Sequence, residues 1–295
     1  MKPYSYIISK PSEIEGVISA FRSLGVKGSS LLISIFTSYT KAEELQKMVD
    51  ALSLSFPEAE ISGMTSSVCI EQGVNHTEKI IVLFEVFEKT YVHTICFDHE
   101  PGKEEAVGCA VMSEIAKISE PLCGIEILAS QSDDRFSDFT PFLNVLTREL
   151  PTTLPVWGAL TDSQTWPDHT YVFSKKYIST AGLILRVYTG EISIMLNHVL
   201  GFRPLSRPLT VTAMDGPMII KELDHKPAVY YYDIHPNPGF SGAVAPLPSY
   251  PTVRRLRPRA PAAGAHARWR HPFQHSLYRR YRAAPLLRRS GADAL

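Results

Sequence analysis

Two short apolar runs, Leu31–Phe36 and Ile125–Ala129, limit the fold more than any other feature of the 295-residue sequence. Each run has the length of a buried strand, and each is followed by the pattern of an amphipathic helix. The apolar positions of these helices are Leu45, Met48, Val49 and Leu52 in the first and Phe139, Phe142, Leu143 and Leu146 in the second. A strand that leads into a helix is typical of a parallel β layer covered by helices. The chain is therefore expected to be an α/β protein.

The elements that follow the first helix return in the same order after the second. They are a short strand (Ala59–Ser62 and Val156–Trp157), a turn of small residues (Gly63–Ser67 and Gly158–Ser163) and a β-hairpin (Lys79–Phe87 with Tyr91–Phe97, and Gly182–Tyr188 with Glu191–Asn197). Equivalent points lie 93 residues apart at Phe36 and Ala129 and 101 residues apart at Val86 and Val187. The order predicts two pseudo-repeated strand-helix-strand-hairpin units that form mixed sheets with packed helices.

Local signals also predict how several helices begin. Ser12 with Glu15, and Thr40 with Glu43, have the spacing of capping boxes, so side-chain caps are expected at the starts of two helices. A further helix is expected to carry Val107, Val111 and Ile115 on its apolar face.

Charge divides the chain near residue 235, although the formal net charge is zero. Residues 236–295 contain eleven Arg, no Lys and one acidic residue, Asp293, which gives a net charge of +10. Subtraction from the 30 basic and 30 acidic residues of the chain leaves 19 basic and 29 acidic residues before this segment, a net charge of −10. The two parts are therefore interpreted separately.

The basic segment, residues 236–295, has more than one interpretation. Its arginines, with aromatic residues such as Trp269 and Tyr278, would suit nucleic-acid binding through phosphate contacts and stacking. Natural basic arms mix Lys with Arg, however, and the abrupt change to Arg, Pro and Ala favours out-of-frame translation of a GC-rich gene. Nucleic acid is therefore the less favoured partner. Disorder is expected in either case, because the segment has almost no periodic apolar pattern.

Several other classes of protein have no support in the sequence. No apolar run approaches the roughly 20 residues that span a bilayer, and the start at Met1 lacks the apolar stretch of a signal peptide, so a cytoplasmic protein without a membrane partner is expected. The cysteines are Cys69, Cys96, Cys109 and Cys123. They form no CxxC pair and lie in or beside apolar runs, so buried reduced thiols are expected and neither a metal nor a cofactor is predicted.

The two small-residue turns are the candidate ligand site. In open α/β sheets, backbone N–H groups and short hydroxyls converge at the carboxyl ends of strands, although ordinary tight turns have the same composition. A pseudo-duplicated fold would bring the two strand ends together. The predicted site residues are Gly63, Thr65, Ser66, Trp157, Gly158 and Asp162. Asp162 would hold an ammonium group, hydroxyl and N–H groups a carboxylate, and Trp157 would form an apolar wall, which suits an amino acid.

The sequence resembles the FIST family at several of these positions. Gly63-Met64-Thr65-Ser66 is similar to the family's Gly-Cys-Ser-Thr-like turn, and Gly158-Ala159 to its later Gly-Gly turn. The strongest match runs from Leu200–Leu205 through Leu209–Thr212, Asp215-Gly216 and Glu222–Asp224 to Lys226–Tyr230, and it resembles the junction into the family's carboxyl-terminal region. Met64, Ala159 and His225 depart from the family pattern. The resemblance covers about residues 25 to 233.

This resemblance implies a bacterial intracellular sensor that binds a small molecule, with an amino acid as the candidate, and signals without catalysis through an effector protein in trans. It also predicts the domain organisation: a FIST N-like sensory domain over residues 1–220, a truncated start of a FIST C-like region over 221–235, and the basic tail over 236–295. Within the truncated region, Ala228–Tyr232 is expected to form a strand.

An enzyme remains the alternative. The chain has no GxSxG, HExxH, P-loop or GxGxxG motif at a strand-to-helix turn. Cys69, two residues beyond the first turn, is a candidate nucleophile without an identifiable base, and Asp133 with Asp134 could supply an acid and a base. Adjacent carboxylates in a polar loop more often belong to a solvated turn or a helix cap.

The tail is predicted to be dispensable for folding. Deletion of residues 236–295 should leave the melting temperature of the remaining chain within a few degrees, because the segment offers little apolar surface to bury. Calorimetry of the full and truncated chains measures the difference. Loss of cooperative unfolding after truncation would contradict the prediction. A continuous reading frame in the gene, with no family-like sequence in another frame, would exclude the frameshift.

Overall fold

The structure is a computed structural model that describes residues 1–130, 138–162, 169–197, 208–216 and 219–234. Residues 1–199 belong to one compact unit, whereas the described residues 208–234 belong to a second. Each unit is described by itself. The predicted domain boundary at residue 220 stays a prediction.

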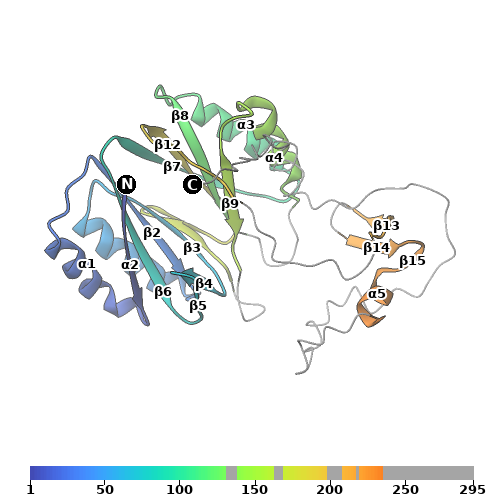
Figure 1. The fold of residues 1–295 in the computed structure, drawn as a ribbon, viewed down its shortest axis with the longest axis horizontal. Coiled ribbons are helices and arrows are strands. Elements are labelled where there is room, and N and C mark those ends of the chain that lie inside the picture. The colour runs from blue at the N-terminus through green and yellow to red at the C-terminus, as the bar shows by residue number, and fades with distance from the viewer. Residues whose placement is uncertain (131–137, 163–168, 198–207, 217–218, 235–295) are drawn as a thin grey trace, which may run out of the picture. The chain divides into compact units, whose positions relative to one another are not determined.

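The larger unit is mixed α/β, as predicted, and its chain builds one arrangement twice (Figure 1). The first copy contains β1 (Lys2–Ile8), η1 (Pro11–Glu13), α1 (Ile14–Ser23), β2 (Ser30–Thr37), α2 (Ala42–Ser55), β3 (Glu60–Thr65), β4 (Cys69–Glu71), β5 (Val74–His76) and β6 (Ile80–Phe87). The second contains β7 (Thr90–Asp98), α3 (Glu104–Ile115), β8 (Leu122–Ala129), α4 (Thr140–Glu149), β9 (Val156–Leu160), β10 (Val172–Ser174), β11 (Tyr177–Ser179) and β12 (Gly182–Gly190).

Strand order confirms the internal repeat. The first copy forms a sheet in the order β1-β6-β2-β3, which β10 and β11 extend, and the second forms a sheet in the order β7-β12-β8-β9. In both copies the two strands joined by a helix are parallel, β2 with β3 and β8 with β9, and the last strand pairs antiparallel with its neighbours on both sides. The two sheets are therefore topological equivalents.

The predicted hairpins, however, are wrong. β6 pairs with β1 and β2, whereas β7 pairs with β12 in the other sheet, so the two consecutive strands do not form a hairpin. Residues 191–197, expected as the last hairpin strand, form no strand. The short connection between β6 and β7 has the length of a hairpin turn, but β7 is the first strand of the second copy, and its partner β12 is 84 residues further on (182 − 98).

Two details of the helices and turns also differ from expectation. The N-cap residues of α1 and α2 are Glu13 and Lys41, and neither makes a side-chain cap hydrogen bond, so both predicted capping boxes are wrong. A 3-10 turn at Pro11–Glu13 precedes α1 and moves its start past Ser12. The small-residue turns begin later than expected, because β3 continues to Thr65 and β9 to Leu160.

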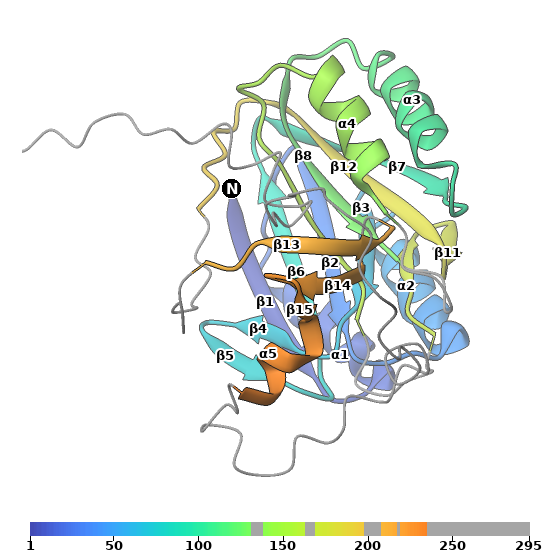
Figure 2. The same cartoon turned by 90° about the vertical axis from the view of Figure 1, so that its right-hand side faces the viewer.

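The two sheets stack face to face, and each is covered on its outer side by two helices. Ile33 and Ile35 of β2 pack with α1 and α2, and Ile125 and Ile127 of β8 pack with α3 and α4. Between the sheets lies a separate apolar cluster formed by Met64, Leu128, Val172 and Ile184. Figures 1 and 2 show the two helix pairs on opposite sides of the strands. The unit is thus a four-layer α-β-β-α arrangement.

Two equivalent glycines allow the parallel strands of each copy to approach closely. A Cβ atom at Gly63 of β3 would lie 2.1 Å from the carbonyl oxygen of Ile35, and one at Gly158 of β9 would lie 2.0 Å from the carbonyl oxygen of Ile127. Both glycines pair in register with those isoleucines. Any side chain would push the strands apart, so these positions require glycine.

The described part of the second unit is a small sheet with one helix. It consists of β13 (Val211–Asp215), β14 (Ile219–Leu223), β15 (Lys226–Pro227) and α5 (Ala228–Ile234). The strand expected at Ala228–Tyr232 is therefore wrong, since these residues begin α5. Pro227 immediately precedes the helix, and its fixed backbone angle is well tolerated at a helix start.

Gly63→Ala is expected to destabilise the protein by about 1–3 kcal/mol, because the added methyl group overlaps a backbone carbonyl that cannot move without displacing β2. Chemical denaturation measures the change. Gly16→Ala is the matched control: the added methyl group meets nothing within 4 Å in the exposed part of α1, so stability should be unchanged or slightly higher. A Gly63→Ala protein as stable as the wild type would contradict the prediction.

Candidate functional site

The carboxyl ends of β3 and β9 lie against each other, as the pseudo-duplicated fold was expected to place them. The backbone N–H of Asp162 donates to the carbonyl oxygen of Thr65 at 3.3 Å. The hydroxyl of Ser67 donates to the carboxylate of Asp162. We call this contact, formed by Thr65, Ser66, Ser67 and Asp162, the strand-end junction. It joins the two copies through polar groups.

The hydroxyl groups at the strand-end junction already have internal partners. Thr65 is fully buried, and its hydroxyl oxygen accepts from the backbone N–H of Tyr171 at 2.9 Å. The Ser66 hydroxyl donates to the carbonyl oxygen of Val68 at 2.7 Å. Asp162 is exposed and Ser66 is half-buried. These two side chains can therefore reach a ligand, whereas Thr65 mainly fixes the loop that contains Tyr171.

The other predicted site residues lie further along the strands. Gly63 is buried inside β3, and Gly158 is exposed within β9. Trp157 precedes Asp162 by five residues (162 − 157), which at about 3.3 Å per strand residue is about 16 Å. The indole ring of Trp157 lies 5.6 Å from the ring of Tyr188, on the side of the sheet that faces the other copy. The structure therefore separates Trp157 from the strand-end junction.

A row of aligned residues, most of them polar, crosses each sheet on the face that looks toward the other sheet. In the second copy the row is Thr94, Arg186, Glu126 and Trp157, one residue from each of β7, β12, β8 and β9. In the first copy the equivalent row is Ser5, Leu83, Ser34 and Ser62. The two rows occupy equivalent positions in the two sheets. Three small serines in the first row thus face charged and aromatic side chains in the second.

Arg186 connects the two rows. Its side chain is only 1% exposed, and its guanidinium donates to the hydroxyl and the carbonyl oxygen of Ser62, each at 2.8 Å, and to the carboxylate of Glu126 at 2.9 Å. Glu85 of β6 lies in the same electrostatic environment, where burial raises the pKa of its carboxyl group and the Arg186 charge opposes that rise. The single positive charge of Arg186 thus acts on two carboxylates, those of Glu126 and Glu85.

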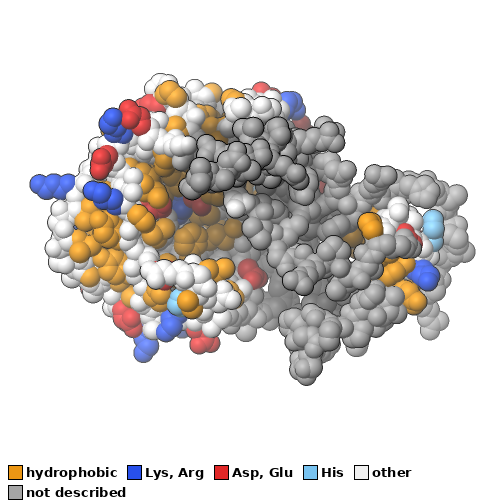
Figure 3. All heavy atoms as spheres, viewed as in Figure 1, with side chains coloured by type: hydrophobic (Ala, Val, Ile, Leu, Met, Phe, Trp, Pro, Cys, Tyr) orange, Lys and Arg blue, Asp and Glu red, His pale blue; other side chains and the backbone are white. Residues whose placement is uncertain are grey.

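The space between the sheets remains open around these charges. Leu83, Glu85 and Trp157 are half-buried although they point into the layer between two sheets, and the side chain of Glu126 keeps 16% of its surface exposed. Figure 3 looks into a hollow in this part of the molecule, with basic and acidic side chains at its bottom among hydrophobic ones. We call this the intersheet hollow. Serine side chains in the first row are too small to fill it.

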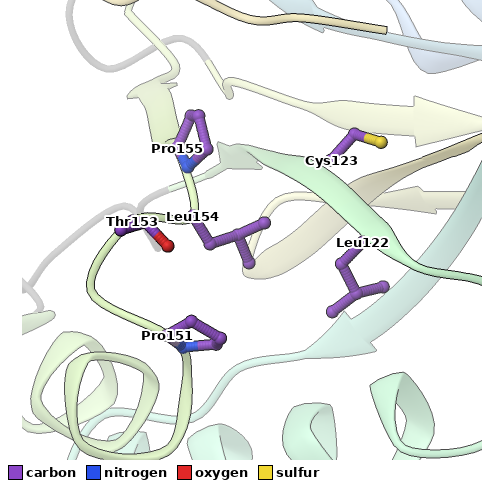
Figure 4. A pocket seen from close by; sticks show the side chains of 6 residues that line it. All are labelled: Leu122, Cys123, Pro151, Thr153, Leu154 and Pro155. Carbon is purple, nitrogen blue, oxygen red and sulfur yellow. The ribbon is translucent and has the colours of Figure 1, made fainter. Parts of the chain in front are cut away.

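A second hollow, of about 290 Å³, lies at the opposite ends of the parallel strands, where β8 and β9 begin (Figure 4). It is lined by Leu122, Cys123, Pro151, Thr153, Leu154 and Pro155. None of these side chains is charged, and none is a predicted site residue. This hollow therefore offers little to orient a polar ligand.

The described residues of the enzymatic alternative are not arranged for catalysis. Cys69 is buried, and burial raises the pKa of its thiol, which disfavours the nucleophilic thiolate. His76 lies opposite Cys69 in the β4–β5 pair, yet the buried Nε2 of His76 has no hydrogen-bond partner among the described residues, so it does not bond the Cys69 thiol. Asp133 and Asp134 lie outside the described residues. All four cysteines are free; only Cys69 is buried and Cys109 is exposed, so the expectation of buried thiols was wrong in part.

The comparison with protein families decides the identity of this two-copy fold. The FIST N domain matches residues 31–226 of the chain. This chain belongs to the FIST family. The match confirms, at the level of the family, the resemblance seen at the glycine-led segments. FIST domains are sensory domains of signal transduction. A search of curated proteins gives no match.

Two further observations bear on this FIST domain. Within the described residues, no group of three or more His, Cys, Asp or Glu side chains is arranged to hold a metal ion. Among the helices that the structure describes, none has both the length and the apolar character needed to cross a membrane.

Arg186→Met is expected to destabilise the FIST domain by about 3–5 kcal/mol, because it leaves Glu126 without its cation and removes the two guanidinium hydrogen bonds to Ser62. Chemical denaturation measures the loss, and adding Glu126→Gln should recover part of it. Arg148→Met is the control, since Arg148 pairs with Glu149 on the surface, where solvent screens the pair, and its loss should leave stability almost unchanged. Equal stability of the two single variants would contradict this role of Arg186.

Proposed function

We propose that this FIST domain binds a small ligand at the strand-end junction, with an amino acid as the candidate, and acts as the input of a bacterial cytoplasmic signalling system without catalysing a reaction. The supporting observation is the meeting of two polar strand ends, one from each copy, in a family of sensory domains. Carboxyl ends of strands are the usual ligand positions in open α/β sheets.

The chemistry of the strand-end junction suits a zwitterion. The exposed carboxylate of Asp162 would accept from the ammonium group, and the hydroxyls of Ser66 and Ser67 would exchange their internal hydrogen bonds for the carboxylate of the ligand. Thr65, Gly63 and Gly158 would act indirectly, because they set the positions of β3 and β9.

A signalling output requires a second protein, and we propose an effector that acts in trans. The proposal includes neither a nucleic acid nor a membrane as a partner. In this proposal the strand-end junction holds the ligand by hydrogen bonds alone. The ligand should therefore be released chemically unchanged.

The test begins with a thermal-shift screen of the protein against amino acids and other small metabolites. For a ligand that raises the melting temperature, calorimetry is expected to show a tenfold to hundredfold weaker affinity for Asp162→Ala, since one charge-assisted hydrogen bond contributes about 1.5–3 kcal/mol. Ser66→Ala should also weaken binding. Asp50→Ala is the control, because Asp50 is exposed on α2 and bonds only to Gln46 among the hydrogen bonds described.

Unchanged affinity in both Asp162→Ala and Ser66→Ala would place the ligand elsewhere. Chemical analysis of the ligand after prolonged incubation is the second measurement. Conversion of the ligand into a product would overturn the non-catalytic part of the proposal and would return attention to Cys69 and to the Asp133 region.

A further inference from the structure

The intersheet hollow has the features of a binding site separate from the strand-end junction. Its charged residues come from both copies: Glu85 from β6 and Glu126 with Arg186 from β8 and β12. About 16 Å of chain, most of it β9, separates Trp157 at the hollow from Asp162, so one amino acid cannot contact both.

The charges of the hollow favour a cation. Arg186 directs three donors to Ser62 and Glu126, and the two carboxylates of Glu85 and Glu126 exceed this single positive charge. The only hydrogen bond described for the Glu85 carboxylate comes from Ser34, at 3.3 Å. An ammonium group that enters the hollow would donate to Glu85 and Glu126 and would balance the charge.

The walls of the hollow favour a ligand with an apolar body. Trp157 and Tyr188 lie side by side, with ring centroids 5.6 Å apart, and both pack in one apolar cluster with Leu32, Phe87 and Val92. Aromatic faces attract organic cations and exclude water. The hydroxyl of Thr94 is a further polar group nearby. It is buried next to Arg186 in the same row and has no hydrogen-bond partner among the described residues.

We propose that the intersheet hollow binds a small primary amine, whose ammonium group lies between Glu85 and Glu126 and whose apolar body packs against Trp157 and Tyr188. This site goes beyond the proposed strand-end site and does not depend on it. The amine would join the two copies, because Glu85 belongs to the first sheet and Glu126 to the second.

The test uses three probes of the same shape that differ in charge: n-butylamine, butan-1-ol and sodium butyrate. Binding is followed by the fluorescence of Trp157 in the full chain carrying Trp166→Phe and Trp269→Phe, which leaves one of the 3 tryptophans. We expect n-butylamine to change this fluorescence saturably in the millimolar range. The other two probes should bind about tenfold or more weakly, because they lack the charged donor.

Glu85→Gln is the decisive variant, since Glu85 is not bonded to Arg186 and its replacement leaves the Arg186 contacts in place. It is expected to weaken n-butylamine binding about tenfold or more. Glu126→Gln should act in the same direction. Glu191→Gln is the control, because Glu191 pairs with Lys89 on the surface, 71% exposed, and its loss should leave the affinity unchanged.

Three results would overturn the proposal: no saturable response to n-butylamine, equal or tighter binding of butyrate, or unchanged n-butylamine affinity in Glu85→Gln. Any n-butylamine bound at Asp162 should not change Trp157 fluorescence, because Asp162 lies five residues from Trp157, about 16 Å along the chain. The strand-end site and the intersheet hollow can therefore fail separately, each in its own measurement.

Discussion

The contact of Arg186 with Ser62 and Glu126 is the interaction on which the association of the two copies depends. It is buried, it crosses from one sheet to the other, and it uses two acceptors on β3 and one on β8. Loss of the guanidinium would leave a carboxylate and a carbonyl oxygen between the sheets with fewer donors than they need. The apolar cluster around Met64 and Ile184 closes the layer on the other side, so the polar contact and the dry cluster together fix how the sheets stack.

Divergence between the copies explains why the hollow exists. Residues at equivalent positions are Ser34 and Glu126, Ser62 and Trp157, Leu83 and Arg186, and Ser5 and Thr94. In this row the first copy has three serines and a leucine, whereas the second has an arginine, a glutamate, a tryptophan and a threonine. Stacked sheets lie about 10 Å apart, a distance that serine side chains cannot fill alone. The helix-facing rows diverged less, since Ile35 and Ile127 occupy equivalent positions against their helices.

The sequence allowed the four helices of the larger unit, the strands next to them and the repeat to be predicted, but not β1, β10 and β11 or the pairing of strands. Apolar runs such as Leu31–Phe36 and Ile125–Ala129 identify buried strands by their composition, and glycines at 63 and 158 mark the close parallel pairs. The partner of β7 depends on a contact with β12, far along the chain, for which no local pattern exists. The strand-end residues could be located because strand ends follow from the element order. Arg186 was missed because one arginine within an apolar strand shows its importance only when its partners on other strands are known.

A different sequence could build the same fold without charges at the hollow, although this chain relies on the Arg186 contacts. A well-packed apolar pair often stabilises a protein as much as a buried ion pair does, because burial of charges costs solvation energy that the ion pair only partly restores. The first copy demonstrates the alternative, since Leu83 occupies the position equivalent to Arg186 within the same topology. Glu85 adds a second carboxylate whose pKa burial raises, which is a cost without a structural partner stronger than the Ser34 hydroxyl. Ionisable groups with a pKa shifted by burial are common at binding and catalytic sites. Glu85, which makes no such contact with Arg186, therefore fits the amine site proposed above better than a role in stability.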